Sequence, residues 1–100
     1  MATVAVRFIA GGDGSNGPID SATAVSEEDL SSSGTSAATT IAAGGFAGEV
    51  CVIYPLENVR VAFGSSPTAT TSAGPIAYSG QPNAFRNLVS GDKVAVITAT

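Results

Sequence analysis

The sequence predicts an all-β domain, a small antiparallel β-sandwich or jelly-roll-like fold of about seven or eight short strands. Apolar residues alternate with polar or small ones over short stretches, and clusters of Gly, Pro, Ser, Asn and Asp separate these stretches about every 8 to 12 residues. Val, Ile and Thr outnumber Leu, Met, Lys, Arg and Gln together, which favours strands over helices. A chain of 100 residues has room for one domain.

The first twenty residues combine one strand with one turn. Residues 4–9 alternate between apolar and other side chains, which predicts a strand. Residues 11–18 contain four Gly, an Asn and a Pro, which predict a turn. We therefore expect residues 1–20 to be an extended N-terminal segment with a Gly-rich turn, and residues 21–100 to form the sandwich.

The next stretch is ambiguous between helix and strand. Ser26 and Asp29 have the spacing of a capping box, which would open a helix over residues 21–30. Residues 31–34, three Ser and a Gly, would end that helix within one turn, so an exposed strand is the better interpretation. The small side chains of residues 37–42 favour a further strand on a crowded surface.

The second half of the chain reads as strands joined by turns. Residues 46–54 are the most apolar run, residues 55–58 form a turn, and residues 59–63 alternate, so these segments predict a β-hairpin. Shorter strands are expected at residues 76–78, 85–89 and 94–98. The expected core consists of Val6, Phe8, Val50, Val52, Val59, Val61, Phe63, Phe85, Val94 and Val96.

The charge and His content excludes several functional classes. The chain has 4 Lys and Arg against 8 Asp and Glu, a net charge of −4 and a pI near 4.3, whereas nucleic-acid binders cluster Lys and Arg. Without His and with a single Cys, it can form neither an internal disulfide, nor a Cys/His metal site, nor a Ser-His-Asp or Cys-His centre. We expect neither enzymatic activity nor a nucleic-acid partner.

The low total charge indicates a protein that functions while packed against partner proteins. Charged residues make up 12% of the chain, whereas globular domains usually carry about 25%. A Ser- and Thr-rich surface protects poorly against self-association; the alternative is a monomer with an uncharged polar coat. No stretch resembles a signal peptide or a membrane span, so we expect synthesis in a cytoplasm and no membrane partner.

Two motifs in the Gly-rich segment match part of the residue pattern of known ligand loops but lack other features that those loops require. Residues 12–17 fit the dinucleotide pattern G-x-G-x-x-G, but neither a helix nor an acidic residue about 20 positions on follows. Asp13, Ser15 and Asp20 offer oxygens for calcium, but the loop places Pro18 and Ala24 where Gly and Glu are required. We expect neither cofactor nor metal here.

The remaining reactive side chains favour structural roles. Glu27, Glu28 and Asp29 form the only charge cluster, and adjacent strand residues point to opposite faces, so we expect a solvated or interface strand edge. Cys51 lies in the most apolar run and is expected to be a core residue. The four cations stand singly on or beside strands, either facing solvent or pairing with acidic residues of a neighbouring subunit: Arg7, Arg60, Arg86 and Lys93. We expect no catalytic, cofactor-binding or metal-binding residue.

Three segments carry a resemblance to a known class of protein. Residues 59–70, VRVAFGSSPTAT, and residues 91–97, GDKVAVI, resemble a strand-and-turn pattern of small proteins encoded in tailed-phage and prophage structural clusters, as does the SSSGTS turn of residues 31–36. The resemblance implies a bacteriophage virion protein with a β-sandwich fold, a decoration (cement) protein on the capsid exterior.

Several properties follow from the resemblance as expectations. Such proteins bind as homotrimers at three-fold and quasi-three-fold positions, bridge neighbouring subunits of the major capsid protein and act without catalysis. The chain would then reside on the virion surface after synthesis in the host cytoplasm. We expect residues 1–20 and the edge strand 21–30 to carry much of the coat contact, by adding a strand to a partner's sheet.

Two other functions remain open. A receptor- or carbohydrate-binding module of a head or tail fibre would use exposed aromatic rings, for which Tyr54 and Tyr78 are the candidates. The other is a different head–tail structural component.

Overall fold

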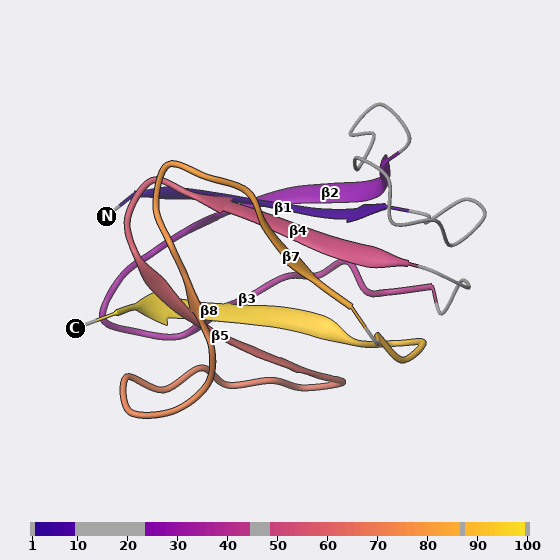
Figure 1. Cartoon of the computed structure of the whole chain (residues 1–100). Helices are drawn as coiled ribbons and strands as arrows, with labels where there is room; N and C mark the ends of the chain where they lie inside the picture. The colour runs from indigo at the N-terminus through magenta and orange to yellow at the C-terminus, as the bar shows by residue number, and fades with distance from the viewer. Residues whose placement is uncertain (1, 10–23, 45–48, 87, 100) are drawn as a thin grey trace.

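Two antiparallel four-stranded sheets pack face to face in the computed structural model, which describes residues 2–9, 24–44, 49–86 and 88–99 (Figure 1). The first sheet has the strand order β2-β1-β4-β7 and the second the order β3-β8-β5-β6. This arrangement confirms the predicted all-β sandwich. The strands are β1 Thr3–Ile9, β2 Ala24–Ser31, β3 Ala37–Ala38, β4 Val50–Pro55, β5 Val59–Gly64, β6 Ile76–Ala77, β7 Asn83–Phe85 and β8 Lys93–Thr98.

The topology is that of a jelly roll. The pairs β3–β8, β4–β7 and β5–β6 are nested along the chain, and every connection except β1–β2 and β5–β6 switches sheet. The place of the final strand of a jelly roll is taken by β1, which lies between β2 and β4. The strand that begins the chain is therefore an interior strand of the first sheet.

The expected hairpin between residues 46–54 and 59–63 is wrong. The strand β4 pairs with β1 and β7, whereas β5 pairs with β8 and β6. The connection, residues 56–58, carries the chain across the sandwich, and its Leu56 N–H donates to the Thr3 carbonyl at 3.0 Å. A short connection fits either arrangement; crossing lets both apolar strands face one shared core.

The core lies between the sheets and differs in part from the expected one. Seven of the expected residues are buried: Val6, Phe8, Val50, Val59, Val61, Val94 and Val96. Val52, Phe63 and Phe85 are only half-buried, whereas Cys51 and Ile53 are fully buried. The run 50–53 is apolar throughout, so no alternation in the sequence reveals which side chains of β4 point inward.

Several strands are shorter than predicted. The strand at 37–42 is confined to β3, that at 76–78 to β6, and the one expected at 85–89 is replaced by β7 at Asn83–Phe85. The strand expected at 21–30 is observed as β2, and its first three residues lie outside the described residues, as does the predicted Gly-rich turn.

The loop between β5 and β6 covers the outer face of the second sheet. Ala69 is buried with Ala95 and Ile97 in a small cluster separate from the main core. The Ala69 N–H donates to Ser36 Oγ at 2.9 Å, and Arg60 Nη1 donates to the Gly74 carbonyl at 2.8 Å. The loop is thus tied down at two points.

Candidate functional site

The strand β2 is the long free edge of the sandwich. Among the described residues the sheets have four edges: β2 with 8 residues, β7 with 3, and β3 and β6 with 2 each. An edge strand leaves alternate backbone donors and acceptors unpaired, which makes it a template for another strand. The structure therefore confirms that the segment bearing the acidic cluster is a strand edge.

The hydrogen-bond pattern shows which backbone groups of β2 are free. Opposed residues of antiparallel strands alternate between bonded and non-bonded pairs. Ser32 N–H donates to the Ala2 carbonyl at 2.8 Å, so even-numbered residues of β2 bond to β1 in the observed register. The N–H and C=O groups of Glu27, Asp29 and Ser31 therefore point away from β1.

An ion pair occupies one end of this surface. Arg7 lies opposite Glu27 in the register of β1 and β2, and its Nε lies 3.1 Å from Glu27 Oε2. Arg7 thus pairs with an acidic residue of its own chain, whereas the sequence left open solvent exposure or a pair with a neighbouring subunit. Both side chains are well exposed, at 42% and 63%, and such pairs contribute about 0–1 kcal/mol.

Glu28 points to the opposite face and holds the edge in place. One carboxylate oxygen, Oε1, accepts hydrogen bonds from Thr40 N–H at 2.8 Å, Thr40 Oγ1 at 3.0 Å and Ile41 N–H at 3.2 Å. Burial acts to raise the pKa of Glu28, but these three hydrogen bonds outweigh it, so the pKa is lowered. Glu28 thereby links β2 to the segment that follows β3 in the other sheet.

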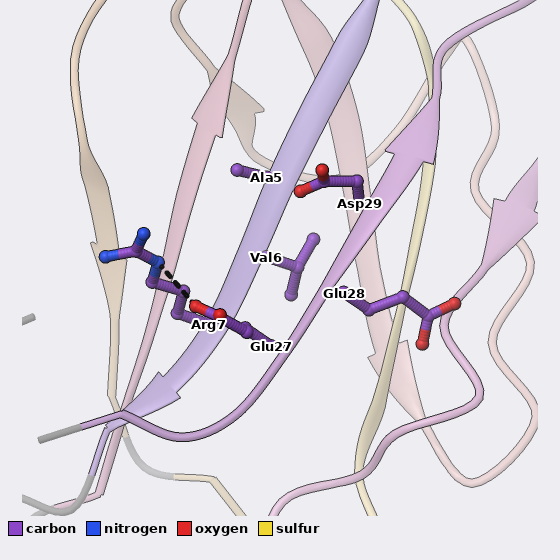
Figure 2. A pocket seen from close by; sticks show the side chains of 6 residues that line it. All are labelled: Ala5, Val6, Arg7, Glu27, Glu28 and Asp29. Atoms are coloured by element: carbon purple, nitrogen blue, oxygen red, sulfur yellow. Dashed lines mark ion pairs between the residues drawn. The ribbon is translucent and has the colours of Figure 1, made fainter.

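A shallow hollow of about 360 Å³ lies on the outer face of β1 and β2. It is lined by Ala5, Val6, Arg7, Glu27, Glu28 and Asp29. Figure 2 shows the joined Arg7 and Glu27 side chains on one side, the Asp29 carboxylate beside Ala5, and Glu28 directed the other way. The small Ala5 side chain opposite Asp29 leaves room for an arriving side chain.

The other residues weighed from the sequence lie apart from this surface. Cys51 is fully buried, and burial followed by the charge of Glu49 raises its pKa to about 12, so the thiol stays protonated. This confirms Cys51 as a core residue. Arg60 lies on β5 in the other sheet, Arg86 is exposed just after β7, and Lys93 begins β8.

Two exposed tyrosines mark a different part of the molecule. Tyr54 is 41% exposed on the outer face of β4, and Tyr78, 51% exposed, follows β6. The Tyr54 hydroxyl donates to the Gly80 carbonyl at 3.1 Å, so its ring is fixed beside the loop that begins at Tyr78. The sequence singled out both residues, and the structure brings them to the same loop.

Sequence reasoning missed the role of Glu57, which appeared only as part of a turn. Its Oε1 accepts hydrogen bonds from the hydroxyls of Ser32, after β2, and Thr98, at the end of β8. These two residues are 25 and 41 positions away in the chain, so nothing local indicates the contact.

The described residues bring backbone groups and carboxylates together at the edge of β2. No group of three or more His, Cys, Asp or Glu that could hold a metal occurs among the residues the structure describes. Gly12, Asp13, Ser15, Gly17 and Asp20 of the two loop motifs lie outside that part of the chain. Within it, no helix is long and apolar enough to cross a membrane. Comparisons with protein-family models, curated proteins and solved structures found no match for this chain.

Proposed function

We propose that this chain is a structural protein of a bacteriophage virion, a decoration (cement) protein that binds the capsid exterior and stabilises the shell. The observation that carries the proposal is the free edge of β2, with 8 residues, on a sandwich whose chain is only 12% charged. A long edge with exposed backbone groups suits strand addition to a partner. The partner in this proposal is the major capsid protein.

Two of the three segments that resemble phage structural proteins contribute the central strands of the second sheet. Residues 59–64 are β5 and residues 93–97 belong to β8, and the two strands pair from Val59↔Thr98 to Gly64↔Lys93. The resembling residues of β5 and β8 thus belong to the scaffold of the fold, and Val61 and Val96 lie opposite each other in the core. This supports a shared fold type and leaves the partner-binding edge on the other sheet.

The proposed mechanism is additive and non-catalytic. Each copy bridges neighbouring coat subunits, and modest contacts repeated by symmetry add up through avidity. A homotrimer at three-fold and quasi-three-fold positions gives every copy the same environment. The net charge of −4 fits a protein on the outer surface, away from the packaged nucleic acid.

The edge of β2 is the better candidate for the coat contact than the beginning of the chain. The backbone of β1 is bonded on both sides, to β2 and β4, so it has no free edge. Deleting residues 1–20 would remove this interior strand and unfold the sandwich. Substitutions on β2 are therefore the sharper test of the contact.

The test is to locate the protein on purified particles. Particles from a strain carrying the gene should contain the chain on their heads, with image density at three-fold positions. Particles from the deletion strain should release DNA at lower temperature. In solution, light scattering should give a mass near three times 9.8 kDa. Absence from heads, or a location on the tail, would overturn the decoration role.

A carbohydrate- or receptor-binding module is the second candidate, favoured by the exposed rings of Tyr54 and Tyr78. Both flank the loop held by the Tyr54–Gly80 hydrogen bond. Sugar rings stack on such surfaces. A glycan array would separate the candidates: binding that is lost in Tyr78→Ala favours the module, and a blank array favours the structural role.

A further inference from the structure

We infer that the free edge of β2 binds an extended segment of the partner as a fifth strand, and that this segment places a basic side chain opposite Asp29. The inference deepens the proposed function and rests on it only for the partner being a capsid protein. The recognition chemistry itself follows from β2 and its neighbours.

A second copy of the chain does not suit this edge. Two β2 strands paired about a two-fold axis would bring the acidic residues 27–29 of both copies together, and like charges on paired strands are destabilising. The two long edges of a dimer would thus repel where they must join. The charge of this edge selects a basic partner instead.

The opposite edge of the same sheet, β7 of another copy, is also a poor partner for β2. Leu56 N–H donates to the Thr3 carbonyl, so even-numbered residues of β4 bond to β1 and odd-numbered ones to β7. Within β7 only Ala84 then points its backbone groups outward, and the preceding Pro82 has no N–H to offer. Head-to-tail joining of copies through β7 and β2 would gain few hydrogen bonds.

The free backbone groups fix where partner side chains lie. The N–H and C=O groups of Glu27 and Asp29 face an added strand, and its residues opposite them project to the same face as these carboxylates. Glu27 is already paired with Arg7. Asp29 has no ion pair within the described residues, so it is the carboxylate left for a partner cation.

The hollow above Ala5 has room for the basic side chain of the partner. Ala5 lies opposite Asp29, and the hollow of about 360 Å³ extends from there to the Arg7–Glu27 pair. A Lys or Arg side chain can lay its aliphatic stem along this floor and bring its charge to Asp29. Glu28, bonded to Thr40 and Ile41, holds the strand in place before the partner arrives, which lowers the entropic cost of binding.

The test uses proline to remove one outward N–H at a time. Asp29→Pro deletes an N–H that does not bond to β1, and proline is tolerated on an edge strand when its missing N–H would face solvent. Ala84→Pro is the matched control on the β7 edge. Asp29→Asn removes the charge and keeps the N–H. Circular dichroism and urea unfolding establish that each variant is folded.

Binding to particles purified from the deletion strain is measured by co-sedimentation at about 50 mM and about 300 mM NaCl. We expect Ala84→Pro to bind like the unaltered protein, Asp29→Pro to bind about tenfold more weakly, and Asp29→Asn to bind several-fold more weakly with less salt dependence. Folded Asp29→Pro that binds as well as the unaltered protein would overturn the inference and leave the proposed function standing.

A second measurement tests the edge without the capsid. A capped peptide of alternating Lys and Thr is added to the isotope-labelled protein, and amide NMR shifts are compared with those caused by a Glu/Thr peptide. Shifts at Glu27, Asp29 and Ser31 with the Lys peptide alone support the inference, even where the unaltered protein fails to bind particles and the proposed function falls. Equal effects of both peptides, or shifts elsewhere, would refute it.

Discussion

Thr98 Oγ1 donates a hydrogen bond of 3.0 Å to Oε1 of Glu57, and the same oxygen accepts the Ser32 hydroxyl. Thr98 ends β8 in the second sheet, whereas Ser32 follows β2 in the first. A single carboxylate in the β4–β5 connection therefore joins the two sheets at one end of the sandwich. Glu28 makes a comparable link between β2 and the segment after β3.

The Glu57 link predicts a pH-dependent stability. The hydrogen bonds from Ser32 and Thr98 lower the pKa of Glu57 below its ordinary value of 4.5. A lowered folded-state pKa stabilises the fold above about pH 4.5, and this contribution is lost as the pH falls through the folded-state pKa. Urea unfolding as a function of pH should show Glu57→Gln losing less stability than the unaltered protein over that acid range.

A hydroxyl variant distinguishes this cause from a general acid effect. Thr98→Val keeps the shape of the side chain and removes the donor, so its acid sensitivity should fall between those of the unaltered protein and Glu57→Gln. Identical pH profiles for all three proteins would show that the carboxylate does not stabilise the fold in this way.

The direction of the β4 side chains predicts unequal effects when Ile53 and Val52 are each shortened to Ala. Ile53 is fully buried in the main core, whereas Val52 is half-buried on the outer face. Ile53→Ala should cost about 2–5 kcal/mol of unfolding free energy, and Val52→Ala less than about 1 kcal/mol. If Ile53→Ala does not fold, Ile53→Val should still cost about 0.5–1.5 kcal/mol. Equal costs in urea unfolding would contradict the observed burial.

Gly74 is predicted to tolerate substitution less well than Gly80. Both have positive φ angles, 92° and 76°, so any side chain adds strain of about 1–2 kcal/mol. A Cβ at Gly74 would also lie 2.6 Å from the Val61 carbonyl oxygen, whereas one at Gly80 meets nothing within 4 Å. Gly74→Ala should therefore lower the melting temperature more than Gly80→Ala. Matching losses would show that the backbone contact yields easily.

Cys51 is predicted to be inert in the folded protein. Its burial and its pKa of about 12 keep the thiol protonated and out of reach, because only an accessible thiolate reacts quickly. At about pH 8, a thiol reagent should label the native protein at least about 100-fold more slowly than the urea-unfolded protein. Rapid native labelling would mean that β4 opens readily.

The pairing of the strands shows where sequence reasoning stopped. Alternation at Val59, Val61 and Phe63 identified a strand, and the turn after Pro55 was also recognised. The same pattern fits a hairpin or a crossing between sheets, because alternation records which face is apolar and not which strand lies alongside. The edge position of Asp29 was anticipated from charge, but its partner β1 and the hollow above Ala5 depend on residues far away in the chain.

The sequence by itself determined the all-β class, the approximate positions of the strands and the core position of Cys51, because these follow from local alternation, turn residues and composition. Tertiary structure alone decided that β4 and β5 lie in opposite sheets, that Ile53 rather than Val52 faces the core, and that Glu57 joins Ser32 to Thr98. These features arise from contacts between residues distant in the chain, which form only when both sheets bury their apolar faces together.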